Sequence, residues 1–113
     1  MDYVAALRAR GFARAWSLLG PQTRRAHGPL ETFARVERSW FEAANDNVIV
    51  RRPTFGPPDP RCMVARDRGP GVDRDRAGLV ELFYPDLPAS PADWEMFIVA
   101  PDGQGEWRMW QVR

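Results

Sequence analysis

Few side chains in this 113-residue sequence are of the kinds that do acid–base chemistry in a small domain. His27 is the only histidine and lies in a polar, arginine-flanked connection, where it could act as a general base or be a solvated loop residue. Glu81 has apolar neighbours in a β-rich run, so it could face a pocket or form an ion pair at an edge. A base or acid at either position would need burial to tune its pKa and a second donor close by.

Other polar groups depend on strand register for their direction, because a slip of one residue moves every side chain to the opposite face. Arg51, Tyr84 and Arg108 could contribute polar groups to a pocket in this way. The tryptophans could form a ligand-stacking box or simply fill the core. The residues that we predict to line a pocket are Tyr3, Trp16, Trp40, Asp46, Glu81, Trp94 and Trp107.

Several kinds of site lack their usual residue patterns. Cys62 is the single cysteine, so it cannot form an internal disulfide and is typical of a small buried apolar residue. No Cys/His cluster has metal-ligand spacing, and Gly69–Gly71 lacks the glycine spacing of a phosphate-binding loop. We therefore predict no metal and no cofactor.

Charge and hydropathy limit the classes of partner. Sixteen basic residues nearly balance fifteen acidic ones, and no basic patch indicates nucleic acid or a membrane surface. The first residues lack the pattern of a secretory signal, and no apolar run approaches the roughly 18 residues of a membrane span. These features predict a soluble, cytoplasmic protein that forms one domain over residues 1–113.

The first half of the chain has helical periodicity. Val4, Leu7, Ala15 and Leu18 recur at spacings of three and four, and Gly11 leaves open one continuous helix or two short ones. Gly20-Pro21 ends this segment. Residues 22–27 form a further helical turn or an ordered loop, and residues 29–44 form a helix that begins at a proline.

The second half has strand patterns throughout. The predicted strands cover residues 48–55, 61–66, 77–84, 94–100 and 106–113, separated by turns rich in proline, glycine and aspartate. Strands joined by short loops run antiparallel as a meander, and helices followed by strands are typical of an α+β domain with the helices on one sheet face. No α-helix is expected after Val48.

The last two strands carry large apolar residues on both faces, which indicates that each face of the sheet is covered. If the helices cover the face of Trp107 and Met109, an apolar patch remains outside. We predict that this patch joins a homodimer, because monomers rarely leave such patches exposed. Its residues would be Phe97, Val99, Trp110 and Val112.

Two stretches resemble one family. Residues 6–21 (ALRARGFARAWSLLGP) are similar to the opening of small bacterial domains of the nuclear transport factor 2-like superfamily, and residues 102–112 (DGQGEWRMWQV) are similar to its final strand after a glycine turn. The resemblance covers about a third of the chain. It implies a cone-shaped, cystatin-like roll in which a strongly bent antiparallel sheet wraps a long helix and leaves a pocket at its open end.

The resemblance implies no single function, because the superfamily includes ketosteroid isomerases, dehydratases, polyketide cyclases, transport factors and non-catalytic domains. Its enzymes commonly place their base on a short strand between the second and third helices, often as an acidic residue. Gly20 to Leu30 contains neither Asp nor Glu. We therefore predict a non-catalytic domain that binds a small apolar ligand or a protein partner. The alternative is a cofactor-free isomerase, dehydratase or cyclase acting in the cone pocket.

Overall fold

The computed structural model describes residues 2–52, 74–87 and 94–112. Within them the helices are α1 (Asp2–Arg8), α2 (Phe12–Ser17), α3 (Pro21–His27) and α4 (Leu30–Ala43). The strands are β1 (Ile49–Arg51), β2 (Gly78–Phe83), β3 (Trp94–Pro101) and β4 (Trp107–Gln111), with a 3-10 turn η1 (Arg74–Arg76) before β2. The predicted α+β class is confirmed.

Glycine and proline divide the helices where their conformations require it. Gly11 separates α1 from α2, so two short helices form in place of a continuous one. Gly20 precedes α3, which has Pro21 in its first turn, and α3 ends at Gly28. Gly28 has φ +83°, a left-handed conformation that side chains with a Cβ rarely adopt. Residues 21–27 therefore form a helix, which the sequence had left open between a turn and a loop.

Helix α4 presents an apolar stripe to the core because Phe33 and Phe41 lie two helical turns apart on one face. Both are buried, and the ring of Phe41 packs at 6.1 Å from that of Tyr84, just after β2. Trp40 packs edge-on to Tyr84 at 5.5 Å but stays only partly buried. The helix predicted over residues 29–44 is confirmed, with its ends one residue inside those limits.

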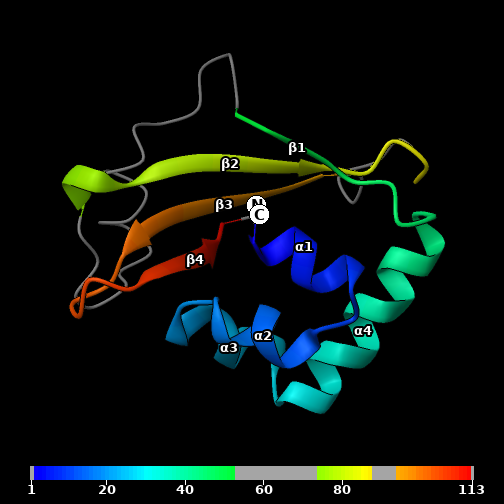
Figure 1. Ribbon diagram of the computed structural model, residues 1–113, viewed down its shortest axis with the longest axis horizontal. Helices are drawn as coiled ribbons and strands as arrows, with labels where there is room; N and C mark the ends of the chain where they lie inside the picture. Colours follow the sequence, from blue (N-terminus) through cyan, green and yellow to red (C-terminus); the bar gives the residue numbers. More distant parts are fainter. Residues whose placement is uncertain (1, 53–73, 88–93, 113) are drawn as a thin grey trace.

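The sheet of the described residues is an open antiparallel meander in the order β1-β2-β3-β4. The predicted strand 61–66 lies outside the described residues, so the prediction of five strands is not tested. Figure 1 shows helices α1 to α4 gathered on one side of this sheet. The cone shape and the cystatin-like roll remain predictions.

One parallel contact adds to the meander. Leu19, between α2 and α3, forms an isolated parallel bridge with Met109. The Gly20 N–H donates to the Met109 carbonyl at 2.7 Å, and the Met109 N–H donates to the Leu18 carbonyl at 2.9 Å. The chain between two helices thus pairs with the edge of β4, which the expectation of a purely antiparallel sheet from residue 48 onward did not include.

Cross-strand register decides which side chains share a face. Phe97 pairs with Gln111 and Val99 pairs with Met109, whereas Ile98 pairs with Trp110. Because directly paired residues point to the same side, Phe97 and Val99 belong with Met109 on the face that the helices cover.

The predicted dimer patch is therefore wrong in part. Trp110 and Val112 do lie on the face away from the helices, in a second apolar cluster with Ile98. Phe97 and Val99 do not, because the prediction alternated each strand separately without knowing their register. Trp110 is also only 5% exposed within a single chain.

Candidate functional site

An apolar cavity of about 220 Å³ opens on the helix-facing side of the sheet. Val80 of β2, Val99 of β3 and Met109 of β4 form its sheet wall. Leu18 approaches from the end of α2, held there because its carbonyl accepts the Met109 N–H. The residues lining the cavity are Asp2, Tyr3, Leu18, Val80, Val99, Trp107, Arg108 and Met109.

Two of the residues predicted to line a pocket meet at this cavity. Tyr3, in the first turn of α1, is 2% exposed and packs its ring 5.5 Å from that of Phe97. Trp107, at the start of β4, is 48% exposed. The cavity therefore has a half-exposed indole and a buried tyrosine among its otherwise mainly apolar walls.

The other predicted pocket residues lie elsewhere. Asp46 forms an ion pair with Arg10 at 2.9 Å, and Glu81 accepts a hydrogen bond from Arg51 at 2.7 Å, so both acids are engaged near the surface. Trp94 pairs with Phe83 at the opposite end of β3. Trp16 and Trp40 pack against the core, each with a buried indole N–H that has no hydrogen-bond partner.

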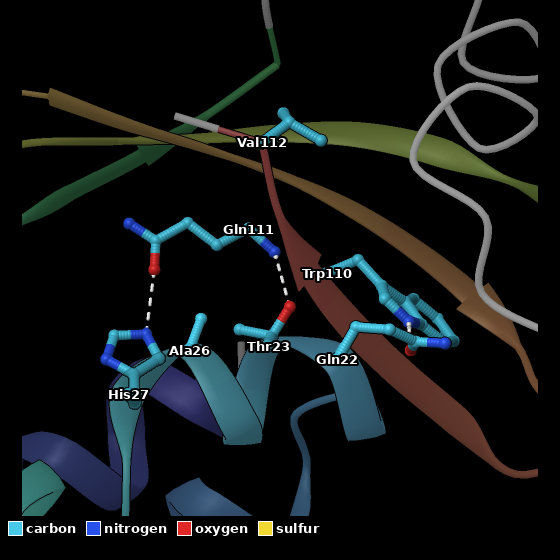
Figure 2. Close-up of a pocket in the computed structure, with 7 residues that line it drawn as sticks. All are labelled: Gln22, Thr23, Ala26, His27, Trp110, Gln111 and Val112. Atoms are coloured by element: carbon cyan, nitrogen blue, oxygen red, sulfur yellow. Dashed lines mark hydrogen bonds between the residues drawn. The ribbon is translucent and has the colours of Figure 1, made fainter.

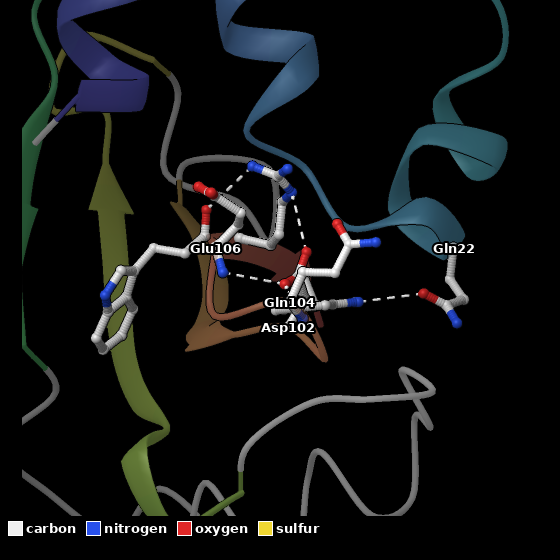
Figure 3. A network of polar contacts seen from close by, with 7 residues as sticks. Gln22, Asp102, Gln104 and Glu106 are labelled. Carbon is white, nitrogen blue, oxygen red and sulfur yellow. Dashed lines mark hydrogen bonds and ion pairs between the residues drawn. The ribbon is translucent and has the colours of Figure 1, made fainter.

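Asp102 organises the turn between β3 and β4 (Figure 3) and forms an ion pair with Arg108, which lines the cavity. One oxygen of its carboxylate accepts the backbone N–H groups of Gln104 and Glu106 at 2.8 and 3.0 Å. The hydrogen bond from Gln104 is the main reason that the pKa of Asp102 is lowered. The other oxygen lies 3.5 Å from Nε of Arg108, so this cation already has an anionic partner.

A buried acid lies behind Tyr3. Glu37 projects from α4 with only 5% of its surface exposed, and no described residue gives its carboxyl group a hydrogen bond or an ion pair. Burial, and then the negative charge of Glu95, raises the pKa of Glu37 to about 8. At neutral pH Glu37 is therefore mostly a neutral carboxylic acid.

Glu95 is the second acid, and its surroundings differ. The Tyr84 hydroxyl donates to its Oε1 at 2.5 Å, and the Gln111 side-chain amide donates to its Oε2 at 2.9 Å. Burial raises the pKa of Glu95, whereas these two hydrogen bonds act in the opposite direction. The net effect is a raised pKa for Glu95, because burial is the largest of these influences.

Tyr3 lines the cavity and also feels the charges of both acids. Burial raises the pKa of its phenol, and the charges of Glu37 and Glu95 raise it further.

A second, larger pocket of about 400 Å³ lies between α3 and β4 (Figure 2). It is lined by Gln22, Thr23, Ala26, His27, Trp110, Gln111 and Val112. Its polar groups largely bond one another. The Gln111 backbone N–H donates to Thr23 Oγ1 at 3.1 Å, and the Trp110 indole N–H donates to Gln22 Oε1 at 3.2 Å. These contacts hold α3 against β4.

His27 belongs to this pocket, neither isolated in solvent nor beside the buried acids. Its Nε2 lies 2.8 Å from Gln111 Oε1. Because the Gln111 amide gives its N–H to Glu95, its oxygen faces His27, and Nε2 must carry the hydrogen. His27 therefore reaches Glu95 only through an amide.

Sequence reasoning missed Glu37 and Glu95 as candidate site residues. Glu37 is spaced four residues from both Phe33 and Phe41, so an acid inside the apolar stripe of a helix was the available signal. Glu95 alternates with Phe97 and Val99 and follows them to the covered face. Both are acids at positions that the apolar pattern marks as interior.

The described residues contain no group of three or more His, Cys, Asp and Glu side chains that could hold a metal ion. None of the helices in residues 2–52, 74–87 and 94–112 is long and apolar enough to cross a membrane.

Comparison with known proteins yields no relative: no family model, no curated protein and no solved structure matches this chain significantly. The resemblance to the nuclear transport factor 2-like superfamily therefore stays a prediction.

Proposed function

We propose that the chain is a small-ligand-binding domain whose ligand is a small, mainly apolar molecule held between Tyr3 and Trp107. The observation that carries the proposal is the apolar cavity on the helix-facing side of the sheet, with a half-exposed indole at its mouth. Apolar walls with few convergent polar groups and a perturbed titratable side chain are the usual features of a ligand site.

The size of the cavity limits the ligand. At about 220 Å³ it is smaller than the roughly 300–1,000 Å³ of pockets that hold drug-sized molecules. A single aromatic ring with a short side chain suits such a volume. Removing that ring and part of Trp107 from water supplies the driving force, at roughly 25 cal/mol per Å² of apolar surface.

The larger pocket by α3 is the weaker candidate. The polar groups of His27, Thr23 and Gln111 already make hydrogen bonds within the chain, so a ligand there would have to replace contacts that hold α3 to β4.

An NMR titration with 2-phenylethanol tests the proposal. The expected result is shifts of the Trp107 indole and the Val80, Val99 and Met109 amides at millimolar probe. Val80→Phe should fill the cavity and abolish these shifts. Val50→Phe is the matched control, because Val50 is exposed on β1 of the same sheet. Shifts confined to Trp110 and Gln111, or none at all, would refute the assignment.

A second candidate function rests on the acid pair. Burial raises the pKa of both Glu37 and Glu95, and only Glu95 has two hydrogen-bond donors that act against this, so the two acids differ in their readiness to hold a proton. This favours the predicted alternative of a cofactor-free isomerase, dehydratase or cyclase with its substrate in the same cavity. The chemistry would need the substrate to pass Tyr3.

Exchange of α-protons on 2-indanone, a small enolisable ketone, tests this alternative. Catalysis would appear as faster deuterium incorporation in D2O than buffer alone gives, and Glu95→Gln should remove it. If the wild-type protein leaves the exchange rate unchanged while 2-phenylethanol binds, the domain binds ligands of this size without catalysing enolisation.

A further inference from the structure

We propose that a pocket beside α3 binds a phosphate monoester, with the phosphate group held by Arg24 and Arg25 next to the Trp16 indole. The pocket has a volume of about 350 Å³ and is lined by Trp16, Pro21, Arg24, Arg25 and Gly28. None of these residues lines the apolar cavity, so the inference goes beyond the proposed function and does not depend on it.

The two faces of α3 differ in what they contact. The face turned to β4 makes the hydrogen bonds that hold the helix to the sheet (Figure 2), and it carries Gln22, Thr23, Ala26 and His27. The pocket-lining positions 21, 24, 25 and 28 follow one another at spacings of three and four, which places them together on the other face. The arginines of this second face are therefore free of the contacts that fix α3 on β4.

The first support is positive charge without a counterion. The guanidinium groups of Arg24 and Arg25 form no ion pair with any described residue, whereas Arg10, Arg51 and Arg108 are each paired with an aspartate or glutamate. No acid lines the pocket, and α3 contains none. Two neighbouring cations match the charge of roughly −1.5 to −2 that a phosphate monoester carries at pH 7.

The second support is the position of Arg24. Its Cζ lies 5.2 Å from the centroid of the Trp16 ring, in a cation–π contact that restricts the side chain before any ligand arrives. The ring provides no acceptor atom, so the five N–H donors of the guanidinium group remain available. Arginine uses these donors in pairs to bind phosphate oxygens, which makes a guanidinium group held in this way a preorganised phosphate ligand.

The third support is that the polar side chains of the pocket are all donors. Arginine and tryptophan side chains have N–H groups and no acceptor, and Trp16, Arg24 and Arg25 are the polar side chains among the lining residues. The indole N–H of Trp16 is also buried without a hydrogen-bond partner, which is uncommon for a buried polar group. A phosphate dianion offers only acceptors, so it complements this set of donors.

NMR titrations with methyl phosphate and methyl sulfate test the proposal at pH 7.5 and constant ionic strength. The two probes have nearly equal shape, but the sulfate carries one negative charge, and neither has an aromatic ring that would enter the apolar cavity. We expect methyl phosphate to bind about tenfold more tightly and to shift the Trp16 indole and the Arg24 and Arg25 Nε–H signals. The Trp40 indole, which is buried and unpaired but does not line this pocket, should not move.

Arg24→Gln and Arg25→Gln should each weaken methyl phosphate binding by about tenfold, because each removes one charge and its paired donors. Arg35→Gln is the matched control, because Arg35 is an exposed arginine on α4 that does not line the pocket. It removes the same charge and should leave the affinity within about twofold of the wild type. If Arg24→Gln does not fold, Arg25→Gln decides the test, because Arg25 is exposed.

Two results would overturn the inference. Equal affinities for the two probes, or an equal loss in Arg35→Gln and Arg25→Gln, would show a general attraction of anions to a basic surface. If methyl phosphate leaves the Trp16, Arg24 and Arg25 signals unchanged, the two arginines only stabilise the negative end of the α3 dipole. Neither result affects the proposed function, because 2-phenylethanol is detected at the separate apolar cavity.

Discussion

A carboxyl group inside a small domain lowers stability when it ionises, unless donors replace the water that it loses. Glu95 has such donors in Tyr84 and Gln111, and Glu37 has none among the described residues. The two glutamates therefore act differently although they share one interior. Glu37 is the residue at which pH should alter stability most.

Glu37→Gln tests this at the level of stability. The pKa of Glu37 is raised in the folded state, so between its unfolded value near 4.5 and about 8 the folded chain holds a proton that the unfolded chain has lost. Stability contributed by this proton is complete below pH 4.5 and falls as pH rises, by up to about 1.4 kcal/mol per unit. In urea unfolding from pH 5 to 8, the free energy of unfolding of the variant should rise relative to that of the wild type.

Glu42→Gln should not change that slope. A wild-type slope that parallels the Glu37→Gln slope would show that Glu37 ionises freely in the folded chain.

Tyr84→Phe tests the support of Glu95. Without the phenol, the buried Glu95 carboxyl group loses one of its two donors, and a buried polar group left unsatisfied costs about 1–3 kcal/mol. We expect a loss of that size at pH 7 by chemical denaturation. In a Glu95→Gln background the same change should cost clearly less, and equal losses in both backgrounds would show that the two residues are not coupled.

Apolar spacing was informative at the residue scale, but it was applied to apolar residues only. The spacing of Phe33 and Phe41 also places Glu37 inside, and the alternation along β3 also places Glu95. Tyr3 and Trp107 were identified as pocket residues from their type alone. Some of the remaining candidates form surface ion pairs with residues far away in the sequence, as Asp46 does with Arg10. Local patterns do not reveal such contacts.

At the scale of elements, the helices and strands within the described residues follow from local signals, whereas their pairing does not. Gly11, Gly20-Pro21 and Gly28 mark the helix ends because each changes what the backbone can adopt. Register depends on contacts across the sheet, so Phe97 was placed on the wrong face. The bridge between Leu19 and Met109 has no sequence signal, because it joins a helix connection to a strand ninety residues later.

That junction gives a prediction for Gly20. A Cβ at this position would overlap the Trp110 indole, so Gly20→Ala must displace the ring or the bridge. We expect a loss of roughly 1–3 kcal/mol, as for other overpacked sites. Gly78→Ala is the control, because a Cβ there meets nothing within 4 Å. Equal unfolding midpoints for the two variants would show that the Leu18–Gly20 segment is not fixed on β4.

At the scale of the whole molecule, the helices cover one face of the sheet and leave part of that face as a cavity. The opposite face holds the second apolar cluster, which includes Trp110. The single chain already buries Trp110, because Gly20 lies against its ring and Gln22 accepts its indole N–H. A homodimer is therefore not needed to remove this side chain from water, and the predicted homodimer has lost its main premise.

Trp110→Glu distinguishes burial of Trp110 within a single chain from its burial in a homodimer interface. If Trp110 is buried within one chain, the variant should unfold or lose several kcal/mol, because a charge replaces a buried ring. Circular dichroism and light scattering measure both properties together. A folded monomer from a dimeric wild type would instead restore the sheet-face homodimer.

The crystal structure of the chain grown with 2-phenylethanol tests the central claim most directly. We predict that the aromatic ring lies against Val80, Val99 and Met109, with Trp107 closing over it and the hydroxyl group directed towards Tyr3. The claim would be contradicted if the Tyr3 or Trp107 side chain fills that space, or if the alcohol binds only beside His27.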